Sequence, residues 1–359
     1  MSSNIRAFVL IFFKLKKILS AVFVIVLVIA GIFIWNLGEN NDLFDQNKNV
    51  NEGGLGQASL HPLSIEAQRK KEYLGSEITI EQTLSSGSNY QKYIASYKSD
   101  GLKIYAFLTV PEAPFPEGGF PAIVFNHGYI PPAEYSTTEK YVAYVDGFAK
   151  EGYIVFKLDF RGHGQSEGKP EGAYYSDAYI TDVLNAVSSI KKYEGVNPAK
   201  IGMWGHSMGG HLTLRAMVVS GDIKAGVIWA GVVGSYDDMI NKWRRRVAWM
   251  PSESERQFRR PGRQELIDRF GTPQQNPQFW QSISPINYVS DISGPLELHH
   301  GLADESVPWE FSQSLNDALF GVQKTAEFFK YEGANHNLSG SAFGQAMARS
   351  VEFFDKYLK

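Results

Sequence analysis

The sequence has no cysteine and almost no net charge. Its 359 residues include 35 Lys and Arg against 38 Asp and Glu, for a net charge of −3. The lack of cysteine excludes structural disulfides, thiolate catalysis and cysteine-based metal sites. The near balance of charge excludes the strongly basic profile of nucleic-acid-binding proteins. Hydrophobic residues make up 43% of the chain, enough for one large α/β domain with an appendage.

Long apolar runs are also absent, with one exception at the N-terminus. Residues 1–17 form a short basic tail, and residues 18–36 follow without a charged side chain. At about 1.5 Å per residue this run reaches roughly 27 Å, close to a bilayer core. Trp35 stands where an interfacial aromatic belongs, and acidic residues follow it. We expect a single-pass anchor with a cytoplasmic N-terminus, so that the large domain after it is extracytoplasmic. The alternative is a signal peptide, which a small-residue cleavage site should follow.

The remaining chain divides into a linker and a domain. Residues 37–75 begin with an Asn-, Gly- and Asp-rich stretch typical of a tether, and a short helix over 61–74 is expected to lie against the domain. Residues 76–359 are predicted to form the catalytic domain. Its expected strands are 77–84, 90–98, 102–110, 122–126, 153–158, 200–204, 225–229, 296–300 and 326–331. Its expected helices are 138–150, 176–193, 208–220, 309–320 and 341–358. Such alternation predicts an α/β fold with a mostly parallel, twisted sheet flanked by helices.

One segment interrupts this alternation. About sixty residues, roughly 234–292, separate two expected strands, which is too long for a structureless loop in a compact domain. We therefore expect a helical cap inserted above the active site. Residues 243–249 and 256–263 within it are basic and aromatic. They indicate either a solvated helix face or recognition of an anionic group or membrane surface.

The pattern Gly205-His-Ser-Met-Gly209 lies between an expected strand and an expected helix. In that setting Gly-x-Ser-x-Gly is typical of a nucleophile elbow. The tight turn should hold Ser207 with φ > 0 at the start of a helix, and the glycines let strand and helix pass closely. The backbone N–H of Met208, directly after the serine, is then the expected first donor of an oxyanion hole.

A serine nucleophile needs a base, and the base needs an orienting carboxylate. In this arrangement the order along the chain is serine, acid, histidine. Asp304 and His336 each follow an expected strand, so both should lie at the sheet edge that carries Ser207. We predict Ser207 as nucleophile, His336 as general base and acid, and Asp304 as the group that fixes its tautomer. Glu305 and Asp317 are the alternative carboxylates.

The remaining polar groups complete the predicted site. The loop His127-Gly128-Tyr129 follows an expected strand, and the Tyr129 N–H is the second expected oxyanion donor. No histidine pair has metal-site spacing, so neither a metal nor another cofactor is expected. Four further histidines are expected to support the catalytic loops: His127, His163, His206 and His211. His299 and His300 are expected to pack in the core.

These motifs resemble the catalytic domain of the prolyl oligopeptidase family of serine peptidases, from about Tyr97 onward. The resemblance rests on Asp159-Phe-Arg-Gly162, Gly205 to Gly210, Ser284-Pro-Ile-Asn-Tyr288, His300-Gly-x-x-Asp304-x-x-Val-Pro308 and His336. It extends to dienelactone-hydrolase-like and esterase neighbours. It implies an α/β-hydrolase fold and a serine hydrolase that acts on a small peptide or an ester. A catalytically inactive binding module and an acyl transferase are the alternatives.

Overall fold

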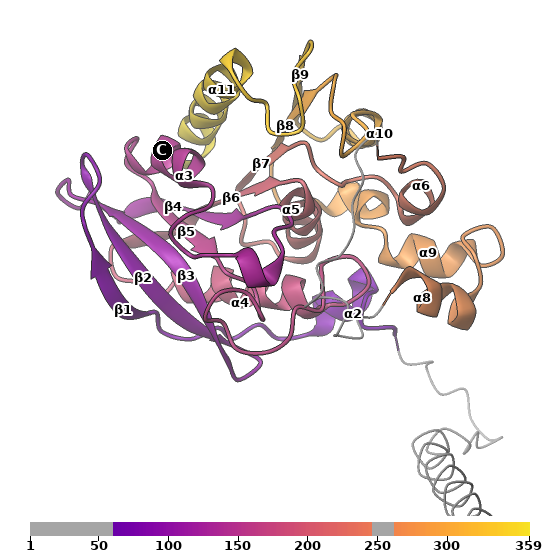
Figure 1. Ribbon diagram of the computed structural model, residues 1–359, viewed down its shortest axis with the longest axis horizontal. Helices are drawn as coiled ribbons and strands as arrows, with labels where there is room; N and C mark the ends of the chain where they lie inside the picture. Colours follow the sequence, from indigo (N-terminus) through magenta and orange to yellow (C-terminus); the bar gives the residue numbers. More distant parts are fainter. Residues whose placement is uncertain (1–59, 246–261) are drawn as a thin grey trace, which may run out of the picture. The chain divides into compact units, whose positions relative to one another are not determined.

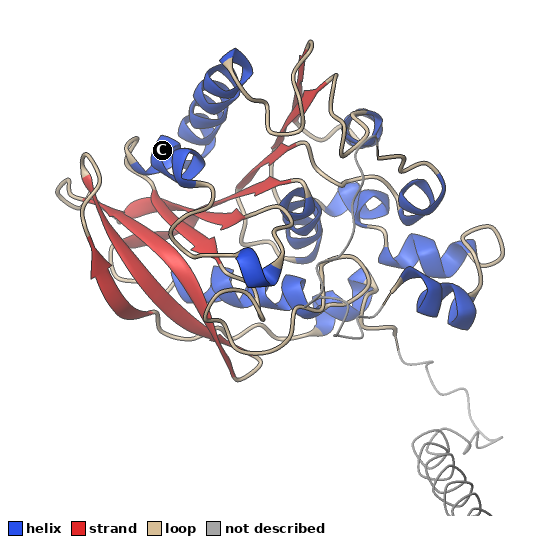
Figure 2. Cartoon of the chain, viewed as in Figure 1, coloured by secondary structure: helices blue, strands red, loops and turns tan. Residues whose placement is uncertain are grey.

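The computed structural model describes residues 60–245 and 262–359, and its centre is one nine-stranded sheet (Figure 2). The strands are β1 (Thr79–Leu84), β2 (Tyr90–Ser99), β3 (Leu102–Pro111), β4 (Phe120–Asn126), β5 (Ile154–Leu158), β6 (Val196–His206), β7 (Ala225–Trp229), β8 (Leu296–Gly301) and β9 (Ala326–Tyr331). All nine correspond to strands that the sequence predicts.

The strand order is β1-β2-β3-β5-β4-β6-β7-β8-β9. Strands β1, β2, β3 and β5 pair antiparallel in succession, whereas the pairs from β5 through β4 to β9 are all parallel. The predicted mostly parallel sheet is thus confirmed. The chain order reverses around β4, which pairs with both β5 and β6. Such a reversal opens the crevice at the carboxyl ends of the strands where α/β proteins bind ligands.

Helices cover both faces of the sheet (Figure 1). Helices α3 (Val142–Ala149) and α11 (Ser341–Leu358) share one apolar cluster with Ile123 and Phe125 of β4. The alternate residues Ala122 and Val124 belong to a second cluster. That cluster includes α4 (Ala178–Ile190), α5 (Met208–Val219) and α10 (Glu310–Gly321). Because the central strands are buried on both faces, they are apolar at consecutive positions.

The insertion between β7 and β8 is helical in its described parts, as predicted. It contains α6 (Tyr236–Asn241), α8 (Arg263–Phe270), α9 (Pro277–Ile283) and the 3₁₀ helix η3 (Pro285–Asp291). Ser235 and Asn276 cap α6 and α9 through their side chains, and a proline opens α9 at a position where no N–H partner is lost. Most of the basic run predicted in this insertion, residues 246–261, lies outside the described residues.

The compact unit begins at Leu60, so residues 60–75, the last part of the predicted linker, belong to the same unit as the domain. The predicted short helix is present here as α2 (Ile65–Lys70), with Ser64 as its N-cap and Ile65 fully buried. Another short helix, the 3₁₀ helix η2 (Pro132–Glu134), follows β4. Within residues 60–245 and 262–359 no helix has the length and apolarity to cross a bilayer. The predicted tail, anchor and first part of the linker, residues 1–59, lie outside the described residues.

Candidate active site

The loops that carry the predicted site residues leave the same edge of the sheet. Asn126, the last residue of β4, is paired with Gly205 near the end of β6. Gly301 and Tyr331, the last residues of β8 and β9, are paired in the same way. Because β7 lies between β6 and β8 and all these strands are parallel, their following loops converge at one end of the sheet.

The turn between β6 and α5 is a sharp elbow with Ser207 at its apex. Ser207 has φ of 56° and ψ of −116°, which confirms the predicted left-handed backbone. A Cβ atom on Gly209 would lie 1.9 Å from the Asn126 carbonyl oxygen, and one on Gly205 would lie 2.3 Å from the Gly209 carbonyl oxygen. Only glycine fits at these two positions, which is why the strand and helix can approach so closely.

Asp304 and His336 are joined by a direct hydrogen bond. His336 Nδ1 donates to Asp304 Oδ2 over 2.8 Å. The other carboxylate oxygen, Oδ1, accepts from the backbone N–H groups of Ser306 and Val307 at 2.7 and 2.9 Å. The Asp304 side chain is fully buried, whereas that of His336 is 12% exposed. The carboxylate is therefore held rigidly, and the imidazole reaches the surface of the site.

His300 makes a contact with Asp304 that the sequence analysis does not predict. Its ring is fully buried, as the packing prediction expects, and its Nε2 donates to Asp304 Oδ2 over 3.1 Å while the Ser312 hydroxyl donates to its Nδ1. Burial alone would raise the pKa of Asp304, yet the hydrogen bonds from His300 and His336 lower that pKa well below its ordinary value. The position of His300 at the end of β8, four residues before Asp304, was the available signal.

The alternative carboxylates do not contact the His336 ring in the same way. Glu305 accepts from the backbone N–H of His336 at 3.4 Å, and within the described residues it has no hydrogen bond to the imidazole ring. Asp317 lies on the exposed side of α10 and accepts from Gln313. Of the three carboxylates considered from the sequence, Asp304 is the one that the imidazole binds.

Ser207 lies close to the loop that carries His336, because the adjacent residue His206 contacts His336. His206 Nε2 lies 3.0 Å from the His336 carbonyl oxygen, and the two imidazole rings are 4.7 Å apart. On the other side, a Cβ atom on Gly128 would lie 3.2 Å from Ser207 Cβ. The elbow, the loop after β4 and the His336 loop thus meet in one cluster.

The loop after β4 has a fixed peptide orientation. His127 Nδ1 donates to the Gly128 carbonyl oxygen over 2.6 Å, and burial lowers the pKa of His127 well below its ordinary value, so the ring is neutral. In a trans peptide the C=O and N–H groups point in opposite directions. The Tyr129 N–H is therefore directed away from His127. The assignment of Tyr129 and Met208 as oxyanion donors stays a prediction.

Comparison with known proteins agrees with this geometry. A family model described as serine aminopeptidase, S33, matches residues 121–280. The chain superimposes on the acylaminoacyl peptidase of Pyrococcus horikoshii with a TM-score of 0.60 at 23% identity, over 76% of this chain and 42% of that one. It superimposes on the acetyl xylan esterase of Paenibacillus sp. R4 with a TM-score of 0.60 at 17% identity. Together with the sheet order, these matches support membership in the α/β-hydrolase superfamily.

One sequence relative of this hydrolase covers most of its domain. The uncharacterized peptidase YtmA of Bacillus subtilis is 26% identical over 253 residues, which are 70% of this chain and 88% of YtmA. The esterase match covers 82% of this chain and 92% of that one. The matched region therefore covers nearly all of YtmA and of the acetyl xylan esterase, but less than half of the acylaminoacyl peptidase.

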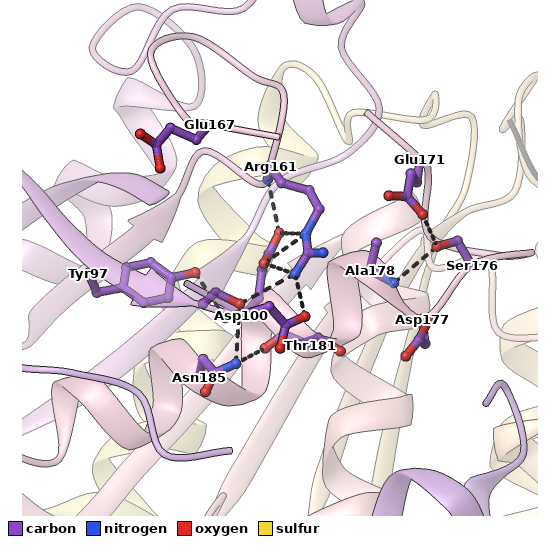
Figure 3. Close-up of polar contacts among 12 residues, drawn as sticks. Tyr97, Asp100, Arg161, Glu167, Glu171, Ser176, Asp177, Ala178, Thr181 and Asn185 are labelled. Atoms are coloured by element: carbon purple, nitrogen blue, oxygen red, sulfur yellow. Dashed lines mark hydrogen bonds and ion pairs between the residues drawn. The ribbon is translucent and has the colours of Figure 1, made fainter. Parts of the chain in front are cut away.

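A buried ion pair joins Arg161, in the loop that follows β5, to Asp182 of α4, and Figure 3 shows the polar contacts around Arg161. Arg161 Nε and Nη2 donate to the Asp182 carboxylate at 3.0 and 2.7 Å, and Nη2 also contacts Asp100 at 3.2 Å. Burial raises the pKa of Asp182, and the Arg161 contacts counteract that rise. The loop carries His163, whose ring packs 5.6 Å from that of His127. The loop that carries Arg161 is thus in ring contact with the loop after β4, and the supporting roles of His163 and His127 stay predictions.

A cavity of about 480 Å³ opens beside Asp304, between the β8 loop and the inserted helices. Trp243 anchors the insertion here, because its Nε1 donates to the Ser306 carbonyl oxygen over 2.8 Å. Most of the residues that line the cavity are charged or aromatic: Asp238, Lys242, Arg244, Arg245, Asp304, Trp309, Glu310 and Phe311, with Leu302, Pro308 and Ser314 completing the walls. The predicted cap thus contributes to the surroundings of the site.

Proposed function

We propose that this protein is a serine hydrolase that cleaves a peptide or ester bond through an acyl-enzyme on Ser207. The observation that supports this proposal best is the hydrogen bond from His336 to the buried Asp304 carboxylate, next to an elbow that holds Ser207 with positive φ. A serine hydroxyl is a weak nucleophile until a positioned base removes its proton. His336 is that base in the proposal, and Asp304 fixes its tautomer.

The proposed reaction has two halves. His336 accepts the Ser207 proton as the serine oxygen attacks the substrate carbonyl carbon, and then donates it to the departing amine or alcohol. Water attacks the acyl-enzyme next, with His336 again acting as base and then returning the proton to Ser207. The N–H groups of Met208 and Tyr129 stabilise the oxyanion, and loss of one such donor typically costs about 3 kcal/mol. Asp304 stabilises the imidazolium while it exists.

A peptidase resembling the prolyl oligopeptidase family is the first candidate. YtmA, the relative that the chain matches over most of both lengths, is named a peptidase. The family model described as serine aminopeptidase points in the same direction. An esterase is the second candidate, because the acetyl xylan esterase is matched over 92% of its length. Both activities use the same groups, so the distinction depends on the leaving group that the inserted helices admit.

The test compares two substrates on the purified full chain. The proposal expects hydrolysis of p-nitrophenyl acetate, of aminoacyl p-nitroanilides, or of both, and complete loss in Ser207→Ala. Comparable kcat/KM values on the anilides and the ester indicate a peptidase, whereas hydrolysis of the ester alone indicates an esterase. If the Ser207→Ala protein retained the wild-type rate, the proposal would be wrong.

A further inference from the structure

Tyr141 and His206 form a hydrogen-bonded connection between the two loops that the proposed reaction uses. Tyr141 precedes α3, and its hydroxyl lies 2.8 Å from the Gly128 nitrogen and 2.7 Å from His206 Nδ1. His206 Nε2 lies 3.0 Å from the His336 carbonyl oxygen. Four residues that are far apart in the sequence are thus linked from the loop after β4 to the loop after β9.

The direction of each hydrogen bond follows from the groups themselves. The Gly128 N–H can only donate, so the Tyr141 oxygen accepts it and its own proton is directed to His206 Nδ1. His206 therefore has its proton on Nε2, which is the atom that faces the His336 carbonyl. The Gly128 N–H, the Tyr141 O–H and the His206 Nε2–H thus each donate to an acceptor.

The protonation states required by this arrangement agree with the surroundings. Burial, followed by the nearby His336, lowers the pKa of His206 to about 3, so its ring is neutral near pH 7. Burial raises the pKa of the Tyr141 hydroxyl, so that group keeps its proton. The His206 ring and the Tyr141 hydroxyl are therefore both neutral near pH 7.

The backbone of Tyr141 is strained. Its φ of 60° and ψ of 23° are left-handed, a conformation rare for an aromatic residue. A Cβ atom on Gly128 would lie 2.6 Å from the Tyr141 oxygen and 3.0 Å from His206 Nδ1. The side chain thus fits into a gap that exists only because residue 128 is glycine. Local strain of this kind is found where surrounding structure over-determines a position.

We propose that Tyr141 and His206 are positioning residues that hold the oxyanion loop at Gly128 and the His336 backbone in one fixed relation to Ser207. His206 immediately precedes Ser207, so this connection sets both loops against the nucleophile. The inference rests on the proposed function, since it assigns these residues to the same reaction. Neither side chain is proposed to touch the reacting atoms.

The test uses Tyr141→Phe, with Tyr153→Phe as the matched control. Tyr153 is a buried tyrosine whose hydroxyl donates to Asp355 at 2.6 Å, outside the connection. On p-nitrophenyl acetate, Tyr141→Phe should lower kcat by about 10-fold to 100-fold with little change in KM, because misplaced groups lose rate and not binding. The rate is expressed per serine titrated by a fluorophosphonate, so a smaller folded fraction does not imitate the effect.

A double-mutant cycle completes the test. His206→Phe keeps an aromatic ring against His336 but removes both nitrogens. If the two residues act through one connection, Tyr141→Phe should cost clearly less in the His206→Phe background than in the wild type. A Tyr141→Phe rate per titrated serine equal to that of Tyr153→Phe, or fully multiplicative effects, would overturn the proposal. A wild-type protein with no hydrolysis and no titratable serine would instead refute the proposed function.

Discussion

At the residue scale, Asp304 is held in place by hydrogen bonds to both of its carboxylate oxygens. Both carboxylate oxygens are occupied, by His300 and His336 on one side and by the backbone of Ser306 and Val307 on the other. A carboxylate with this many donors is stabilised as an anion. It can therefore hold the His336 tautomer and stabilise the imidazolium form without itself taking a proton.

Replacing Asp304 with Asn should lower kcat by about 10³-fold to 10⁴-fold, because an amide favours the wrong imidazole tautomer. Steady-state kinetics on p-nitrophenyl acetate measures the effect. Asp317→Asn is the control, since Asp317 lies on the exposed side of α10, and it should keep the wild-type rate. A larger loss in Glu305→Gln than in Asp304→Asn would mean that the neighbouring carboxylate has the orienting role.

Asp304 should also make the stability of the fold depend on pH. Its pKa is lower in the folded protein, so its contribution is present above the unfolded pKa of about 4 and is lost as pH falls toward the folded pKa. Urea unfolding between about pH 4 and pH 3 should show a slope smaller in Asp304→Asn, by at most about 1.4 kcal/mol per pH unit, the limit for one proton. Identical slopes in the two proteins would refute the perturbed carboxylate.

At the scale of elements, Arg215 connects α5 to the N-terminal segment and to the insertion. Its side chain is fully buried and donates to two backbone carbonyls and two side-chain oxygens, those of Leu63, Ile283, Gln68 and Tyr236. Burial lowers the pKa of Arg215. The helix that begins directly after Ser207 is thereby fixed to α2, α6 and α9.

Arg215→Met should lower the free energy of unfolding by about 3 kcal/mol, because several buried oxygens lose their donor at once. It should also increase amide hydrogen exchange in α2. Arg69→Met is the comparison, since Arg69 contacts the Val218 carbonyl oxygen but is partly exposed. Water can replace its contacts, so the loss should be smaller. Equal losses would show that Arg215 is not the main connection.

The elements were largely predictable from the sequence, and their contacts were not. The strands and the loops carrying Ser207, Asp304 and His336 follow from local alternation of apolar runs and turn residues. The sequence predicts packing for His300, because its position four residues before Asp304 does not by itself show which way its ring turns. The connection through Tyr141 was missed for the same reason, since it joins residues brought together only by the packing of α3 against the sheet.

At the scale of the whole molecule, the apolar run over residues 18–36 predicts attachment to a membrane. We propose that this segment anchors the domain, with residues 1–17 in the cytoplasm and the hydrolase outside it. The full chain should then sediment with membranes and resist carbonate extraction, whereas a chain lacking residues 1–36 should not. Protease added to intact cells or spheroplasts should degrade the domain. A full chain that stays in the supernatant would contradict the anchor.

The central claim is that Ser207 is made nucleophilic by His336, and its most direct test is the site and rate of covalent labelling. The account predicts that a fluorophosphonate forms one adduct, that tandem mass spectrometry locates it on Ser207, and that His336→Ala slows labelling by more than about 10³-fold. An adduct on another residue, or a labelling rate that is unchanged in His336→Ala, would contradict the account.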